Sequence, residues 1–239
     1  ATMPGTDCLE MKSQDVHDFK EVQSVADFEG RRFMSEIMGV AGWGQTPAMM
    51  KKTINSVTSF GVTHVVPHGI NVNRKIETIP YPADWFTENP YWNYLHLWTD
   101  FSRRTAFINR QGNLLADVLL INPLESAFAL SENYFADEHT KSWDPIVDEI
   151  NDVYSNSMRN LTRNNIDYLI ADKFYIEKGV IGTQGEDCKI SINNHDFSVI
   201  IIPPMYVISR QGAAKILQFA EKGGKVVVLG RIPEGSPDE

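Results

Sequence analysis

Short apolar clusters alternate with amphipathic stretches along most of this chain, and that alternation constrains its fold more than any other feature. Two parallel strands need a long crossover between them, usually a helix, so this alternation is typical of α/β proteins with parallel sheets. The clearest cluster is the apolar run 199–202, which ends at Pro203 and Pro204 and reads as a buried strand. We therefore expect an α/β fold.

The first part of the chain predicts two strands, at 33–40 and 64–67, with a helix between them. Thr46 is expected to cap this helix and Pro47 to begin it, because a Thr side chain accepts a hydrogen bond from the first turn and Pro suits the first helical position. Gly61 suits the C-terminal cap. The result is a strand–helix–strand unit of a parallel sheet.

A connection over residues 69–90 follows, and it is rich in Asn, Pro and aromatic residues. A loop of this length without secondary structure is usually functional when it occurs inside a compact domain. An aromatic-rich helix is expected next, over residues 90–109. Four of its residues keep helical spacing and are expected in the core: Tyr91, Tyr94, Leu95 and Trp98.

The second part of the chain reads as a regular β-α-β-β-α-β series, which is consistent with an open sheet flanked by helices. We expect strands at 116–121, 168–171, 197–202 and 226–229, helices at 144–163 and 209–221, and a hairpin-like excursion at 180–192. A polar turn at 110–113 separates the two parts. The sequence therefore predicts two domains, residues 1–110 and residues 111–239, the second with an open, flavodoxin-like α/β fold.

Charge and composition exclude several classes of partner. The net charge is -9, so the chain gains nothing from neutralising phosphates, and we expect neither nucleic acid nor an anionic membrane as a partner. No apolar run approaches the roughly 20 residues that span a bilayer. No basic stretch followed by an apolar one marks a signal peptide. Cys8 and Cys188 form neither a disulfide framework nor a metal-binding spacing.

The sharpest local feature is Glu36, an acid near the end of an otherwise apolar strand. Burying a carboxylate is costly unless it is paired or used. At the C-terminal end of a barrel strand, such a residue would open onto the active-site face. The alternative is a structural role, in which Glu36 caps a neighbouring helix or pairs with Arg31 or Arg32.

Other candidate site residues surround Glu36 in the sequence. His68 follows the next predicted strand and is itself followed by the polar Asn71, although a lone histidine in such a place is often only structural. Trp43 and Trp85 are candidate platforms for a sugar, because aromatic faces contact the apolar faces of sugar rings while His, Asn and carboxylates bind the hydroxyls. Asp7 is a further candidate if it projects from the end of a preceding strand, although terminal acidic residues are usually solvated.

In four short motifs the chain resembles the late part of large bacterial glycoside hydrolases of the β-galactosidase and α-L-rhamnosidase type. The motifs are Met-Pro-Gly-Thr-Asp at 3–7, Phe-Met-Ser-Glu at 33–36, the strand end His-Gly at 68–69, and Asn-Pro-Tyr-Trp at 89–92. In those enzymes a (β/α)8 barrel is followed by an open α/β domain that resembles class I glutamine amidotransferases. The resemblance implies that residues 1–110 are the last units of such a barrel and that residues 111–239 are the amidotransferase-like domain.

The resemblance also implies a role for Glu36, which matches the catalytic carboxylate of the family as nucleophile or general base. Glycoside hydrolysis needs two carboxyl groups across the scissile bond. The partner expected in this family lies on an earlier barrel strand, and no segment of this chain matches it. A complete barrel takes roughly 250 residues, so residues 1–110 resemble only its last two or three units. We therefore expect the chain to be inactive alone and to need the remainder of the barrel.

The second domain departs from true amidotransferases. Those enzymes place a nucleophilic cysteine at a strand-to-helix turn, whereas Ile202 is followed by Pro203, Pro204, Met205 and Tyr206. A hydrolase or transferase acting through this domain is thereby disfavoured. The implied role is structural, either packing against the barrel or bridging the subunits of a homo-oligomer. No metal or organic cofactor is implied.

Two expectations therefore compete. In the first, the chain is a portion of a glycoside hydrolase whose substrate is an oligosaccharide or other glycoside. In the second, it is a non-catalytic α/β module for carbohydrate binding or assembly. They differ in whether strand 33–40 runs parallel beside strand 64–67, with Glu36 and His68 side by side at the carboxyl ends.

Overall fold

The computed structural model describes residues 2–9, 16–39, 41, 44–69, 87, 89–130, 145–184 and 187–238. The chain divides into two compact units, residues 1–114 and residues 115–239. The sequence predicts this division a few residues earlier, after Arg110. Both units combine parallel strands with helices, so the expected α/β fold class is confirmed. Within the described ranges, none of the helices is both long enough and apolar enough to span a bilayer.

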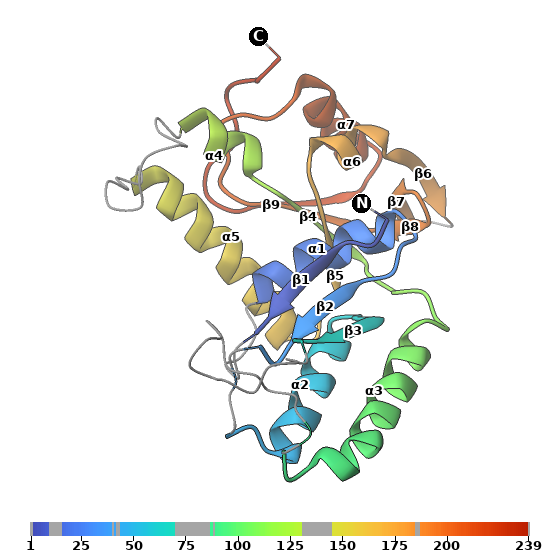
Figure 1. Cartoon of the computed structure of the whole chain (residues 1–239). Helices are drawn as coiled ribbons and strands as arrows, with labels where there is room; N and C mark the ends of the chain where they lie inside the picture. Colours follow the sequence, from blue (N-terminus) through green and yellow to red (C-terminus); the bar gives the residue numbers. More distant parts are fainter. Residues whose placement is uncertain are drawn as a thin grey trace. The chain divides into compact units, whose positions relative to one another are not determined.

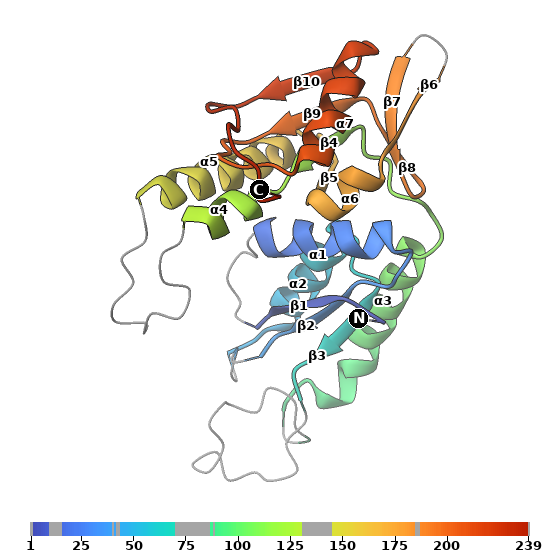
Figure 2. The same cartoon turned by 90° about the horizontal axis from the view of Figure 1, so that it is seen from above.

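The first unit is built on a three-stranded parallel sheet with the order β1-β2-β3. Its strands are β1 (Gly5–Cys8), β2 (Met34–Ile37) and β3 (His64–Pro67), and they run side by side in Figure 2. Its helices are α1 (Val16–Phe28), α2 (Pro47–Ser59) and α3 (Leu95–Asn109), with the short 3-10 turn η2 (Trp92–Tyr94) before α3 (Figure 1).

The ends of α2 follow from the residues predicted to form them. The Thr46 hydroxyl accepts a hydrogen bond from the Met49 amide at 3.3 Å, and Pro47 begins the helix. Gly61 adopts φ +85° just beyond the helix, a left-handed conformation that glycine reaches without a steric penalty. These three predictions are confirmed.

The helices of the first unit share one hydrophobic cluster with the strands. The cluster joins apolar residues of α1, α2, β1 and β2, with α3 packed at its margin, and includes Cys8, Phe19, Ile37, Ile54 and Val57. One cluster shared in this way places the helices on one face of the sheet. Along β2, Ser35 and Ile37 are buried while Met34 and Glu36 are half-buried. Since strand side chains alternate between faces, Glu36 points to the face that these helices leave uncovered.

The second unit contains a four-stranded parallel sheet with the order β10-β9-β4-β5. Its strands are β4 (Val118–Ile121), β5 (Tyr168–Ala171), β9 (Val199–Ile202) and β10 (Lys225–Val228), and its helices are α4 (Leu124–Leu130), α5 (Pro145–Arg163), α6 (Lys173–Lys178) and α7 (Arg210–Glu221). A separate antiparallel sheet joins β6 (Val180–Gln184), β7 (Asp187–Ile192) and β8 (His195–Phe197), as Figure 2 shows.

The strand order of the second unit is that of a flavodoxin-like sheet. From β4 the chain moves to β5 on one side, returns across β4 to β9, and continues outward to β10. Right-handed crossovers in the two directions place α5 and α7 on opposite faces of the sheet. The direction of winding reverses between β4 and β9, and ligands bind at the carboxyl ends of the strands at such a switch point in open α/β sheets.

Three expectations about individual elements were incomplete or wrong. The strand expected at 197–202 is divided at Ser198, whose amide donates to the carbonyl of Asp117 at 2.9 Å, so that β8 joins the antiparallel sheet and β9 the parallel one. Helices α1, α4 and α6 were not predicted. Tyr94, the last residue of the turn that leads into α3, is 65% exposed rather than in the core.

Candidate functional site

Glu36 and His68 lie side by side at the carboxyl ends of two parallel strands. Glu36 belongs to β2, and His68 follows the end of β3, where its amide donates to the Ile37 carbonyl at 2.9 Å and extends the pairing of the two strands. The Nδ1 atom of His68 lies 3.0 Å from Oε1 of Glu36. Glu36 thus pairs with His68, and the described residues show no such pairing with Arg31 or Arg32.

The two side chains remain within reach of a ligand. The exposed fractions are 27% for His68 and 34% for Glu36. An ionised carboxylate only accepts hydrogen bonds, so Nδ1 of His68 carries the proton in this pair. The other ring nitrogen, Nε2, can form a hydrogen bond with a hydroxyl group, which is both a donor and an acceptor. The pair therefore offers a carboxylate of fixed orientation beside a ring nitrogen that can bind a hydroxyl group.

Asp7 lies on the neighbouring strand beside Glu36. The two residues are directly in register between β1 and β2, so their side chains point to the same face of the sheet. Adjacent strands are about 4.8 Å apart, and Asp7 is exposed. Among the described residues, the face opposite the helices thus presents two carboxylates, from β1 and β2, and an imidazole from the residue that follows β3.

The turn after β2 holds a residue that sequence reasoning missed. Met38 adopts φ 63°, a left-handed conformation that is uncommon for a residue other than glycine. Its side chain is buried, and its amide donates to the Cys8 carbonyl at 3.1 Å. Backbone strain of this kind clusters at functional sites. No sequence signal marks it, because methionine has no preference for this conformation.

The structure brings together three of the six residues predicted for the site: Asp7, Glu36 and His68. The remaining three, Trp43, Asn71 and Trp85, lie outside the described residues. Among the residues that the structure describes, no group of three or more His, Cys, Asp and Glu side chains could hold a metal ion.

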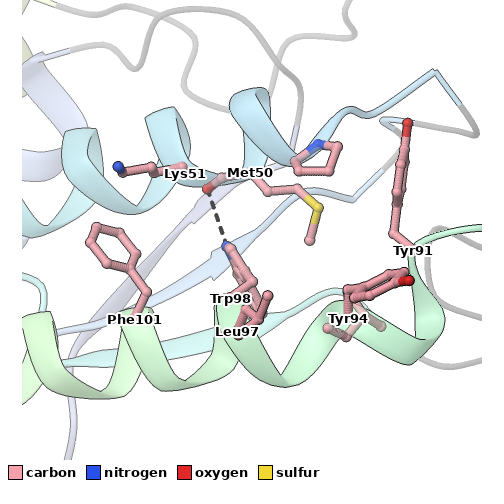
Figure 3. A pocket seen from close by; sticks show the side chains of 9 residues that line it. Met50, Lys51, Tyr91, Tyr94, Leu97, Trp98 and Phe101 are labelled. Atoms are coloured by element: carbon pink, nitrogen blue, oxygen red, sulfur yellow. Dashed lines mark hydrogen bonds between the residues drawn. The ribbon is translucent and has the colours of Figure 1, made fainter.

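A cavity of about 400 Å³ lies between the N-terminal parts of α2 and α3 (Figure 3). Its lining is mainly aromatic and aliphatic, with Met50, Tyr91, Tyr94, Trp98 and Phe101 around it. The indole nitrogen of Trp98 donates to the Met50 carbonyl at 3.2 Å, which joins the two helices. Because its described lining includes no carboxylate or amide side chain, the cavity suits sugar hydroxyls less well than the face that carries Glu36.

At the switch point of the second unit, a serine bridges two segments. The hydroxyl of Ser126 in α4 donates to the Val207 carbonyl at 3.1 Å and accepts from the amides of Tyr206 at 2.9 Å and Val207 at 3.1 Å. The segment after β9 contains no thiol, and Cys188 lies buried on β7. This edge therefore has no cysteine nucleophile.

Polar groups also gather beside that serine. Burial raises the pKa of Glu125 above its ordinary value, and the nearby charges of Asp172 and Glu177 act in the same direction while Lys173 acts against it. Glu177 accepts a hydrogen bond from the Ser209 hydroxyl at 2.5 Å. Two of these groups are helix caps, since Asp172 accepts from the Tyr175 amide at the start of α6 and Ser209 accepts from the Gly212 amide at the start of α7.

No protein-family model matches this chain, and no curated protein matches it either. Among solved structures, the chain is similar to Gan42B, a GH42 beta-galactosidase, with a TM-score of 0.54 and 12% identity over 93% of this chain and 32% of that one. A catalytic mutant of Gan42B from G. stearothermophilus gives a TM-score of 0.55 at 11% identity, again over 93% and 32% of the two chains. Alpha-L-fucosidase isoenzyme 2 from Paenibacillus thiaminolyticus gives a TM-score of 0.50 at 17% identity, over 92% and 29%.

These likenesses establish a shared fold. The chain spans about a third of the length of the structures it matches. Those structures are glycoside hydrolases, the class of enzyme that the sequence motifs resemble. The chain thus has the fold of part of such an enzyme, and its own chemistry has to be argued from its residues.

Proposed function

We propose that this chain forms part of the active site of a glycoside hydrolase, with Glu36 as a catalytic carboxylate acting as nucleophile or general base. The observation that carries the proposal is the 3.0 Å contact between Glu36 and His68 at the carboxyl ends of adjacent parallel strands. In barrel enzymes the active site lies at that end of the strands. The fold-level likeness to a beta-galactosidase and a fucosidase supports the same class of reaction.

The proposed substrate is an oligosaccharide or other glycoside. His68 and Asp7 would bind its hydroxyl groups from the uncovered face of the sheet. Trp43, Asn71 and Trp85 are proposed as further contacts, the tryptophans as platforms for the apolar face of a sugar ring. Glycoside hydrolysis needs a second carboxyl group across the scissile bond, and we propose that an earlier barrel strand supplies it.

The domain roles belong to the same proposal. Residues 1–110 would be the C-terminal portion of a barrel, and the remainder of the barrel would pair with the outer edges of β1 and β3. Residues 111–239 would be an amidotransferase-like domain without a nucleophile, packing against the barrel or bridging subunits. The alternative function is a non-catalytic carbohydrate-binding or assembly module, for which the same residues would bind sugar without turnover.

A Glu36→Gln substitution in the full-length protein that carries this sequence tests the proposal. The probes are the p-nitrophenyl β-D-galactoside, α-L-fucoside and α-L-rhamnoside. Because the amide can act neither as nucleophile nor as base, kcat on whichever probe is hydrolysed should fall about a hundredfold to ten-thousandfold, with binding of the free sugar retained. The matched control is Glu29→Gln, which makes the same change at an exposed position of the same unit. Unchanged turnover in Glu36→Gln would remove the assignment, and sugar binding without turnover in the unsubstituted protein would favour the binding module.

A further inference from the structure

We infer that Gly39 is a positioning residue, which leaves the space in which the imidazole of His68 lies against Glu36. The inference deepens the proposed function and rests on it for its kinetic consequence. Its geometric content concerns only the described residues of the first unit. Gly39 itself would touch no substrate.

The evidence is the lack of room for a side chain at position 39. A Cβ atom there would lie 2.9 Å from Cγ and 3.1 Å from Nδ1 of His68, and 2.8 Å from Cδ2 of Leu9. Real Cβ atoms essentially never approach other heavy atoms to less than 3.0 Å. The Leu9 methyl is the far end of a flexible chain and can move aside. The Cγ atom of His68 is bonded directly to its own Cβ, so the whole ring has to move.

Hydrogen bonds hold the backbone segments on both sides of the His68 ring, so the ring is the part that would move. On one side, the buried Met38 is held by the hydrogen bond of its amide to Cys8. On the other side, the His68 amide is bonded to the Ile37 carbonyl. Both backbone segments are therefore anchored to β1 and β2. A methyl group at position 39 would displace the imidazole rather than either backbone.

A small displacement is enough to break the pair. The distance from Nδ1 to Oε1 is 3.0 Å, and a contact at about 3.6 Å is no longer a hydrogen bond. A displaced ring would leave Glu36 without its fixed orientation and would move Nε2 away from the hydroxyl it is proposed to bind. Gly39 thus acts through His68 on the carboxylate.

Space, rather than backbone conformation, explains the glycine at this position. Gly39 does not adopt a left-handed φ, so alanine is compatible with the local backbone. Gly44 lies five residues further along the chain and shares the absence of a left-handed φ, and a Cβ atom added there would meet none of the described atoms outside its chain neighbours within 4 Å. Gly44→Ala is therefore a matched control that makes the same chemical change without the contact to His68.

The first test needs no substrate. Proton–nitrogen correlation spectra of the imidazole rings report the position of the proton and the hydrogen bonding of each nitrogen, and His68→Gln assigns the His68 signals. In Gly39→Ala the Nδ1 signal of His68 should move toward its position in Glu36→Gln, while Gly44→Ala leaves it unchanged. A His68 spectrum in Gly39→Ala identical to that of the unsubstituted protein would overturn the inference. An equal change in Gly44→Ala would also overturn it.

The second test separates positioning from a general structural role. In the full-length protein, Gly39→Ala should lower kcat on the hydrolysed p-nitrophenyl glycoside about tenfold to a hundredfold, the effect of a misplacement approaching 1 Å. In a His68→Ala background the same substitution should cause no further loss, because the ring it displaces is gone. Equal losses in both backgrounds would refute positioning through His68. Absence of any hydrolysis by the unsubstituted protein would count against the proposed function alone, and the spectra would still decide the inference.

Discussion

Ser209 offers the sharpest test of how the second unit is stabilised, through the substitution Ser209→Ala. Its side chain is fully buried at the N-terminus of α7. The hydroxyl accepts from the Gly212 amide at 3.0 Å and donates to Oε1 of Glu177 at 2.5 Å. One atom therefore caps a helix and ties it to α6. Alanine removes both contacts and leaves the Glu177 carboxylate short of a donor.

The expected loss follows from these two contacts. Removing a serine N-cap costs about 1 kcal/mol, and a hydrogen bond to a charged group contributes about 1.5 to 3 kcal/mol. Because the two contacts share one hydroxyl, they do not add fully. We expect the free energy of unfolding of the second unit to fall by about 2 to 3 kcal/mol.

Urea unfolding followed by circular dichroism measures this loss. The matched control is Ser191→Ala, since the Ser191 hydroxyl also donates to a carboxylate, that of Asp196, at 2.5 Å but at an exposed position. Exposed pairs of this kind contribute less than about 1 kcal/mol. If Ser209→Ala lowered stability no more than Ser191→Ala, burial and capping would not be what makes this hydroxyl matter.

Two further predictions concern the second unit. Because burial raises the pKa of Glu125, the folded state binds its proton more tightly than the unfolded state does, and stability falls as the pH rises above the ordinary value of 4.5. Glu125→Gln should therefore raise Tm at pH 7 and leave Tm nearly unchanged at pH 4. An equal change in Tm at both pH values would contradict this cause. A Cβ at Gly224 would overlap ring atoms of the buried Phe219, so Gly224→Ala should lower the free energy of unfolding by about 1 to 3 kcal/mol. The control Gly182→Ala adds its methyl in open space, and a comparable loss there would exclude overpacking as the reason.

Local signals were sufficient to predict elements whose ends depend on neighbouring residues. Helix α2 is an example, because Thr46, Pro47 and Gly61 each act within one turn of the helix. Helix α1 was missed because its buried side includes Lys20, Gln23 and Ser24. These polar residues interrupt the apolar periodicity from which an amphipathic helix is predicted, and they are buried only through tertiary packing.

The candidate site could be predicted from the sequence in part. The proximity of Glu36 and His68 follows from two successive parallel strands, whose carboxyl ends meet at one edge of the sheet. The role inferred for Gly39 was not predictable, because the space around it is set by Leu9 and His68, which lie far from it in the sequence. The sequence shows the glycine at position 39 but not its neighbours in the folded chain.

Ser126 forms three hydrogen bonds at the switch point between β4 and β9, and these bonds have a consequence for ligand design. A small molecule entering between β4 and β9 would first have to break three hydrogen bonds, each worth about 1 kcal/mol net. It would also have to offset the free-energy cost of leaving the buried Ser126 hydroxyl without hydrogen-bond partners. The design of ligands for the described residues therefore has a better starting point at the exposed Glu36–His68 pair than at the carboxyl ends of β4 and β9, where open α/β sheets ordinarily bind their ligands.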